Sequence, residues 1–510
     1  MTFVNVSLWL EGKRLQLPKI SQLTIESSYN THHQFTIYIP LSDASPLDYP
    51  DVEQLMGEYI DIRFQLAGGS NKGGRFLGVV DELKPSFSED GKAHLIINGY
   101  SPSHIMDTSS AFDCFGNCTL TDLAEKAVKP YRKKYFPPVD IERCSEKVEW
   151  SIQAESCYQY LCRIAELYGK VFYYDGNQFF FGKLRAPDQK PIPLEMGKQL
   201  HNLEFSLNLA PADLVVKGWD SCSGKELQVE SDKLVTNNRI LKSIIDKSRK
   251  CYPRAEVYAR HSIAEGNELK RLANRLLARQ VHELFTVEGV SSDPSLRIGS
   301  EVILGHNHNF LRNDVKNRHF LIIYVHHQIS AENTYQNSFL AIPAGLPYPV
   351  PMLADHSRIS GTLRAIVRDI ADPDGLGRVK VELIGARAKP APLSPWLRVL
   401  ASSVAEYGFQ SIPQPCEQVL LFFEDIFNPD QSPYVLGSIR NQAFPAGTTP
   451  ENTGIFTKEA GLWINRKTGT LKLWGRQVEI LGDKLIMDGE EGTWIACDMG
   501  KRPKLQPKAL

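Results

Sequence analysis

The residues with the clearest potential for metal chemistry lie in the stretch Asp372–Leu383, which reads DPDGLGRVKVEL. Two aspartates close to a glycine are typical of calcium-binding loops. If Gly375 held the sixth position of an EF-hand loop, Ile370 would take the first position and Val381 the twelfth, and both positions require carboxylates. The register therefore argues against calcium and predicts a tight turn that opens into an alternating strand.

Cysteines and histidines also lack the spacing of a metal site. Cys157 and Cys162 lie five positions apart on an expected helix, roughly 140° apart around its axis, so their sulfurs point away from one another. The histidine pairs at positions 306 and 308 and at 326 and 327 lack the HExxH spacing of zinc hydrolases. We expect free thiols, no metal and no cofactor.

Catalytic and nucleic-acid-binding patterns are equally weak. The chain has no Gly-x-Ser-x-Gly elbow, and its scattered carboxylates single out no glycosidase pair. The glycine-rich run 68–74 lacks the Lys-Ser/Thr pair of a phosphate loop and predicts a hairpin tip. With 58 Lys+Arg against 59 Asp+Glu, the net charge of −1 favours no nucleic-acid partner. We therefore predict no catalytic residue.

The elements that must position these residues are mostly short strands. Residues 1–105 alternate between apolar and polar positions, and turn residues separate the runs. A helical pattern runs over 119–135, with Thr119 as the N-cap and Pro130 ending the helix. Further helices are predicted at 156–169, with Ser156 as the N-cap, and at 263–281. A β-hairpin with aromatic strands follows the second helix at 171–181. The pattern indicates a mainly β protein with α insertions.

Composition changes divide the chain into expected domains. The proline-rich stretch 343–351 predicts a domain exit, so residues 1–352 form the first domain. Residues 353–447 hold about five strands, including 378–384, 396–400 and 418–423, which suits a small closed barrel of the OB type. Residues 448–497 contain strands of four or five residues, at 462–465, 471–474, 478–481 and 485–488. Residues 498–510 form a basic tail that we expect to be flexible.

The short strands after residue 448 have a physical consequence. Strands of this length cannot close a core within one chain, because isolated small hairpins are marginal in water. Several copies wound together would bury their apolar side chains, so this segment predicts an obligate oligomer. The expected core residues of this needle segment are Leu471, Leu473, Val478, Ile480 and Leu485.

Taken together, these segments resemble the VgrG family, the spike proteins of type VI secretion and related contractile injection systems. The run Asp372–Val381 resembles the opening of that family's needle-base OB domain. The motifs PWLRV at 395–399, GF at 408–409 and EQV at 417–419 then follow in the family's order, and PYVLGSI at 433–439 resembles its closing strand. The helix and aromatic hairpin at 150–182 also resemble a family motif.

The resemblance implies a homotrimer with a hub of two barrel-like domains, OB-fold barrels and a triple-stranded β-helix. It also implies that the trimer assembles in a baseplate, seats on a hexameric Hcp-type tube, carries a PAAR-type tip protein and effector cargo, and contacts a target membrane transiently when the sheath contracts. The needle segment of about forty residues is shorter than in many relatives, and we expect no effector domain after it. The early Glu11 argues against a signal peptide, so we expect synthesis in the bacterial cytoplasm, with secretion on firing.

The end of the needle segment gives one positive site prediction. Three copies of an apolar patch would meet there in a trimer, and such a patch needs a cover. The expected tip-partner residues are Met487, Trp494, Ile495 and Ala496. The same residues would alternatively close the trimer's own core. Other functions left open are a phage-tail spike with peptidoglycan hydrolase activity, a spike of an extracellular phage-tail-like particle, and a monomeric carbohydrate-binding β protein.

Overall fold

The computed structural model forms two compact units, residues 1–439 and residues 440–510. It describes residues 2–15, 20–29, 31–41, 52–67, 73–87, 93–132, 134–184, 190–220, 224–262, 266–305, 318–345, 361–402, 411–423, 433–445, 449–457 and 459–480. None of the helices in these ranges combines the length and apolar character needed to cross a membrane.

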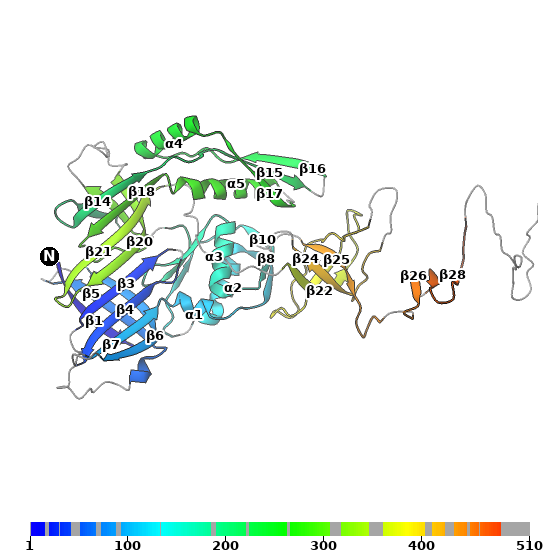
Figure 1. The fold of residues 1–510 in the computed structure, drawn as a ribbon, viewed down its shortest axis with the longest axis horizontal. Coiled ribbons are helices and arrows are strands. Elements are labelled where there is room, and N and C mark those ends of the chain that lie inside the picture. The colour runs from blue at the N-terminus through cyan, green and yellow to red at the C-terminus, as the bar shows by residue number, and fades with distance from the viewer. Residues whose placement is uncertain are drawn as a thin grey trace, which may run out of the picture. The chain divides into compact units, whose positions relative to one another are not determined.

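Eight antiparallel strands of the first unit close into a barrel, drawn in blue and yellow-green in Figure 1. Around the barrel each strand pairs with the next in the order β20-β3-β4-β7-β6-β5-β1-β21, and β21 pairs back with β20. The strands are β1 (Thr2–Leu10), β3 (Gln22–Ser28), β4 (Gln34–Leu41), β5 (Tyr59–Leu66), β6 (Gly73–Phe87), β7 (Ala93–Tyr100), β20 (His319–Ile329) and β21 (Thr334–Pro343). Alternate residues such as Phe35, Ile37 and Ile39 are buried, which explains the period-two pattern of the sequence.

The same sheet continues beyond this closed barrel. The strands β18 (Phe285–Ser291) and β14 (Leu200–Leu207) extend it from β21, and β19 (Glu301–Gly305) and β13 (Ile192–Glu195) extend it from β20. The short β2 (Lys13–Arg14) pairs with β1. The long strands β20 and β21 therefore belong both to the closed barrel and to a second curved sheet, as expected for a hub of two barrel-like domains.

A helical insertion packs against the barrel, in cyan in Figure 1. Its longest helix is capped by Ser156, whose Oγ accepts a hydrogen bond from the Gln159 amide, and Gly169 lies just beyond its end with φ of 65°. Thr119 and Asp122 form a capping box on the preceding helix, so both predicted N-caps are confirmed. The elements are α1 (Ser103–Asp107), β8 (Asp113–Thr119), α2 (Leu120–Val128), β9 (Val139–Ile141), β10 (Lys147–Gln153), α3 (Cys157–Leu167), β11 (Val171–Tyr174) and β12 (Phe179–Gly182).

The helix that was predicted to begin at Thr119 and to be ended by Pro130 stops just before that proline. It ends at Val128 and continues as a 3-10 turn, η2 (Lys129–Tyr131), because Pro130 has no amide hydrogen for an α-helical bond. The predicted aromatic hairpin is confirmed, with β11 and β12 paired antiparallel and every residue of both strands buried. A further 3-10 turn, η1, spans Val52–Leu55.

A separate three-stranded sheet has the strand order β16-β15-β17. The strands β15 (Leu214–Asp220), β16 (Lys225–Glu230) and β17 (Ala255–Ser262) pack against α5 (Gly266–Val281) through buried Leu214, Val216 and Ala273. The described part of the helix predicted at 263–281 matches α5. The helix α4 (Arg239–Cys251), capped by Asn238, was not predicted, because its apolar positions are diluted by lysine and arginine.

The OB-type barrel contains β22 (Thr362–Asp369), β23 (Lys380–Leu383), β24 (Gln418–Phe422) and β25 (Tyr434–Ile439), in the order β23-β22-β24-β25. The strand predicted at 396–400 does not form a ladder of its own. Instead, Leu397 bridges Val379 beside β23, and Val399 bridges Val435 on β25. The segment makes one isolated β-bridge to each neighbour, which is too little pairing for a strand. Together the two bridges close the barrel.

The second unit contains an antiparallel sheet in the order β26-β27-β28, with β26 (Asn452–Phe456), β27 (Gly461–Asn465) and β28 (Leu471–Trp474). The next predicted strand, 478–481, is wrong over its described residues, since Val478–Ile480 have no strand structure. A strand needs a neighbour for its backbone hydrogen bonds, and these residues pair with no described strand. The expected strand at 485–488 and the tail 498–510 lie outside the described residues.

Candidate assembly surfaces

The connection from β22 to β23 is held by the Asp372 carboxylate. Its oxygens accept hydrogen bonds from the amides of Asp374, Leu376 and Arg378, at 3.2, 2.9 and 3.1 Å. They also accept bonds from the Arg378 guanidinium, with Nη2 at 2.5 Å and Nε at 3.0 Å. The guanidinium bonds, with the amide bonds, hold the pKa of Asp372 far below its ordinary value.

This geometry explains why the motif looks like an ion site from its residue types. Amide and guanidinium hydrogens occupy the positions that a cation would take around the Asp372 oxygens. Gly375 and Gly377 have φ of 67° and 71°, the left-handed conformation that lets the chain turn around the carboxylate. The loop presents Leu376 at its tip, with 59% of that residue exposed.

The OB barrel shares a core with the helical insertion. Trp150 and Ile152 of β10 and Cys114 of β8 are buried in one cluster with apolar residues of the OB strands, such as Val381 and Val419. The cluster joins segments more than 200 positions apart, which no local pattern in the sequence signals.

Two polar contacts fix the same junction. The Asp113 carboxylate accepts a hydrogen bond from the Ala388 amide at 3.2 Å, and the Phe112 carbonyl accepts one from the Arg387 amide at 3.2 Å. The OB barrel is therefore attached to the hub by both packing and hydrogen bonds.

The three C-terminal strands carry an apolar face that nothing described covers. The register aligns Ile455 with Leu462, Leu462 with Leu473, and Ile464 with Leu471, so these side chains share one face of the sheet. Their exposed fractions are 57% for Ile455, 38% for Leu462, 46% for Ile464, 62% for Leu471 and 48% for Leu473. We call this set the apolar needle face.

The opposite face of this sheet is chemically different. Lys472 and Trp463 are direct register partners there, and the Lys472 ammonium lies 6.0 Å from the centre of the Trp463 ring. Register also places Trp474 on this face, so the face mixes a charge with aromatic rings, whereas the apolar needle face is aliphatic.

Two of the five predicted needle-core residues, Leu471 and Leu473, belong to the apolar needle face. Val478 and Ile480 follow the last strand and are 48% and 64% exposed. Leu485 and all four predicted tip-partner residues, Met487, Trp494, Ile495 and Ala496, lie outside the described residues. The sequence prediction missed Ile455, Leu462 and Ile464 as core candidates, although their alternation within 452–465 signals the same face.

One hydrogen-bonded relay has the residue types of a hydrolase. Ser103 Oγ lies 2.8 Å from His32 Nδ1, and His32 Nε2 lies 3.0 Å from Asp107 Oδ2. However, Ser103 is 1% exposed and its Oγ also bonds Ser101 Oγ at 2.7 Å. The relay joins α1 to the barrel, and its serine offers no surface to a substrate.

Cys157 and Cys162 both lie on α3, and both are free thiols. Cys157 Sγ donates to the Ala127 carbonyl at 3.2 Å, and burial raises the pKa of its thiol to about 12. The described residues contain no group of three or more His, Cys, Asp or Glu side chains placed to hold a metal ion.

Residues 363–439 match the model of the type VI secretion system/phage-baseplate injector OB domain. The match covers β22 to β25 and the segment that closes the barrel. No sequence among the curated proteins matches this chain.

Solved structures extend the likeness to the hub. One is an E. coli component of the type VI secretion system that is structurally similar to the bacteriophage T4 tail proteins gp27 and gp5. The alignment covers 85% of this chain and 99% of the E. coli chain at 16% identity, with a TM-score of 0.53. Another is the half-lidded Francisella PdpA-VgrG complex, in which 93% of this chain and 88% of the matched chain align at 10% identity, with a TM-score of 0.58. This chain has a VgrG-type fold.

The VgrG-type fold confirms the resemblance inferred from the motifs between Asp372 and Ile439. It also confirms a mainly β architecture with α insertions and an OB domain. Residues 363–439 are thus similar to an injector OB domain, and the fold of the whole chain is similar to that of a type VI secretion component.

Proposed function

We propose that this chain is the structural spike of a bacterial contractile injection apparatus and that it works as a homotrimer. The observation that carries the proposal is the uncovered apolar needle face on a VgrG-type fold. In water, five exposed aliphatic side chains on three short strands give a sheet that is marginal by itself. Copies of the same face, related by a closed symmetry, remove that surface from water.

Further apolar side chains on the outside of the OB barrel support the same assembly. Leu400, Phe422 and Leu436 are 61%, 40% and 38% exposed. Phe422 pairs with Tyr434 across β24 and β25, and the Leu400 amide donates to the Val435 carbonyl, so the three lie on adjacent segments of the barrel. In the trimer these residues contact the neighbouring OB barrels.

The finer assembly steps belong to the same proposal. The hub seats on a hexameric Hcp-type inner tube within a baseplate, the needle end holds a PAAR-type tip, and effectors travel as cargo through the target membrane on sheath contraction. A matched solved structure is itself a complex of a VgrG protein with PdpA, which supports the idea that this fold carries further proteins. The chain acts through rigidity and docking, and we propose no catalytic step.

Light scattering coupled to gel filtration tests the trimer directly. The purified full chain is expected at three times its mass of 57.4 kDa. A monomer mass over a tenfold range of concentration would contradict the proposal. Incubation with purified peptidoglycan tests the structural role, because release of soluble fragments would instead favour a hydrolase.

A further inference from the structure

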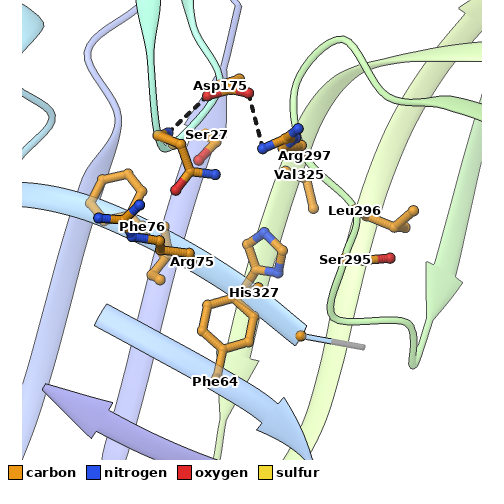
Figure 2. A pocket seen from close by; sticks show the side chains of 15 residues that line it. Ser27, Phe64, Arg75, Phe76, Asp175, Ser295, Leu296, Arg297, Val325 and His327 are labelled. Atoms are coloured by element: carbon orange, nitrogen blue, oxygen red, sulfur yellow. Dashed lines mark hydrogen bonds and ion pairs between the residues drawn. The ribbon is translucent and has the colours of Figure 1, made fainter. Parts of the chain in front are cut away.

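The polar cavity of the hub already pairs its own charges. It lies beside Asp175 at the β11–β12 turn and measures about 140 Å³. The Asp175 carboxylate forms an ion pair with Arg297 Nη1 at 3.1 Å, as Figure 2 shows. At about 30 Å³ for each water, the cavity has room for about four or five waters. A surface for a larger partner lies elsewhere in the hub, at one end of its long sheet.

This surface is the open edge of β14, the last strand of the thirteen-stranded sheet, where β18 is its only partner among the described strands (Figure 1). The other end of the sheet is β13, which has four residues and contains Pro193, a residue without an amide hydrogen. By contrast, β14 has eight residues and no proline. An unpaired edge of this length offers a row of backbone donors and acceptors to another chain.

The register shows which backbone groups face the open side of β14. Directly after the strand, the Asn208 amide donates to the Leu284 carbonyl at 2.9 Å, so the even-numbered residues bond the β18 side. The direction of the backbone groups alternates along an antiparallel strand, so those of Leu203 and Leu207 face away from β18. The Leu203 amide accordingly donates to the side chain of Asn202, at 2.9 Å, and not to β18.

A groove of about 300 Å³ lies on the sheet face beside this edge, over β14, β18, β21 and β20. Glu204 and Glu288 are direct register partners in it, and both are exposed, so their carboxylates repel one another. Leu340 and Tyr324 continue the same row, and the Tyr324 hydroxyl donates to a third carboxylate, that of Glu26, at 3.1 Å. Among the described residues, the groove lining includes no lysine or arginine.

The open edge and the groove together select one kind of partner. In a strand added beside β14, a residue opposite Glu204 lies on the groove face, where a basic side chain neutralises the carboxylates of Glu204 and Glu288. Residues opposite Leu203 and Leu207 lie on the other face, where Leu207 is 45% exposed and an apolar side chain covers it. We propose that β14 accepts, by antiparallel strand addition, an extended segment of a partner protein in which basic residues alternate with apolar ones. This surface is separate from the apolar needle face and does not depend on the spike function.

Calorimetry on the full chain tests the edge with an acetylated and amidated octapeptide of alternating valine and lysine. This peptide is expected to bind saturably, and more weakly as the salt concentration rises. The same peptide with glutamate in place of lysine is expected not to bind. A third peptide keeps the lysines but carries N-methyl groups on the valine amides, which in the proposed register lie opposite Leu203 and Leu207. It is expected not to bind, because it cannot donate to the edge.

Two substitutions on β14 test the charge and the backbone separately. Glu204→Gln removes one carboxylate and is expected to weaken binding of the valine-lysine peptide about threefold, as for an exposed ion pair. Leu207→Pro removes one open-side amide, at a position where an edge strand tolerates proline, and is expected to weaken binding about fivefold. Glu226→Gln, at an exposed position on β16 of another sheet, is the matched control and should leave the binding unchanged. Thermal unfolding of each variant shows that it is folded.

Failure of the valine-lysine peptide to bind overturns the proposal, and protection of the β14 amides from hydrogen exchange in the free protein would then assign the edge to a second copy of the chain. Equal binding of the glutamate peptide would overturn the basic character of the partner. Equal binding of the N-methylated peptide would show a contact through charge alone and overturn strand addition. Unchanged affinity in both Glu204→Gln and Leu207→Pro would place the peptide elsewhere on the protein and overturn the assignment to β14. The trimer mass, measured on the same samples, reports separately on the proposed spike function.

Discussion

Arg378 closes the loop between β22 and β23 by placing both its Nε and its Nη2 on the carboxylate of Asp372. The Asp372 and Arg378 side chains are 3% and 12% exposed, so the pair is largely protected from water. The loop lies within the segment 363–439 that matches the injector OB domain, and the ion pair fixes its conformation.

Replacing Arg378 with lysine is expected to destabilise the first unit by about 1–2 kcal/mol. Lysine keeps the charge but cannot donate from two fixed nitrogens, so at least one charge-assisted bond is lost. Urea denaturation followed by fluorescence measures the change. Arg368→Lys is the control, because its partner Glu382 forms a more exposed pair, and the expected change there is within about 0.5 kcal/mol. Equal losses in both variants would show that the Asp372 geometry has no special weight.

Two buried histidines should make the hub sensitive to mild acid. Burial lowers the pKa values of His33 and His327 to about 3, against an ordinary 6.5. The unfolded chain therefore binds protons first, and the stability that is complete above pH 6.5 is lost as the pH falls toward 3. Between pH 7 and pH 5 the loss is about 2 kcal/mol for each histidine.

Denaturant titrations at the two pH values measure this loss for wild type and for His327→Gln, in which glutamine offers Tyr335 a polar partner. The variant is expected to lose less stability on acidification than wild type. The control variant His201→Gln changes an exposed histidine and should lose as much stability on acidification as wild type. The same slope in wild type and His327→Gln would contradict the role of His327.

Trp150 is expected to be the main apolar link between the hub and the OB barrel. It is 3% exposed within the cluster that contains Val381 and Val419. Trp150→Ala leaves a large cavity there and should cost about 3–5 kcal/mol, measured by denaturant unfolding. Trp219→Ala removes a tryptophan that is 45% exposed and should cost much less. Limited proteolysis that leaves Trp150→Ala no more sensitive than wild type would argue against the link.

A charge on the apolar needle face should prevent trimer formation. Leu473→Lys places an ammonium between its register partner Leu462 and the copies that we propose to cover the face. The mass measured by light scattering is expected to fall from trimer toward monomer. Lys472→Leu, one position away on the opposite face, serves as the control and should remain trimeric. A trimer in Leu473→Lys would remove the apolar needle face from the interface.

Deletion of residues 455–500 should abolish binding of the tip partner and keep binding of the hub to the tube. The deletion removes the whole apolar needle face together with the predicted tip residues Met487, Trp494, Ile495 and Ala496. Pull-down with a PAAR-type protein is expected to lose the tip partner, whereas binding of the hub to an Hcp-type tube should persist, because the closed barrel is intact. Unchanged recovery of the tip partner would contradict the tip assignment.

The sequence by itself determined the local elements. Ser156 and Thr119 predicted the starts of their helices, because a capping side chain bonds an amide only three residues away. The turn at Gly375 and the aromatic hairpin at 171–181 were equally readable, since turn chemistry and alternation are short-range properties. The ordered motifs from Asp372 to Ile439 were sufficient to indicate the injector OB domain. The basic helix α4 was not predicted from the sequence, because only a few apolar residues form its buried face.

The tertiary structure decided which distant residues meet. Closure of the barrel through β21 and β20, the burial of Trp150 in the OB core and the cavity beside Asp175 all join segments more than 100 positions apart. The Asp372 motif shows the difference most plainly: its residue types suit a cation, but the folded loop satisfies its oxygens with Arg378 and backbone amides. Sequence patterns report on neighbours along the chain, whereas these contacts follow from how the sheets close and pack.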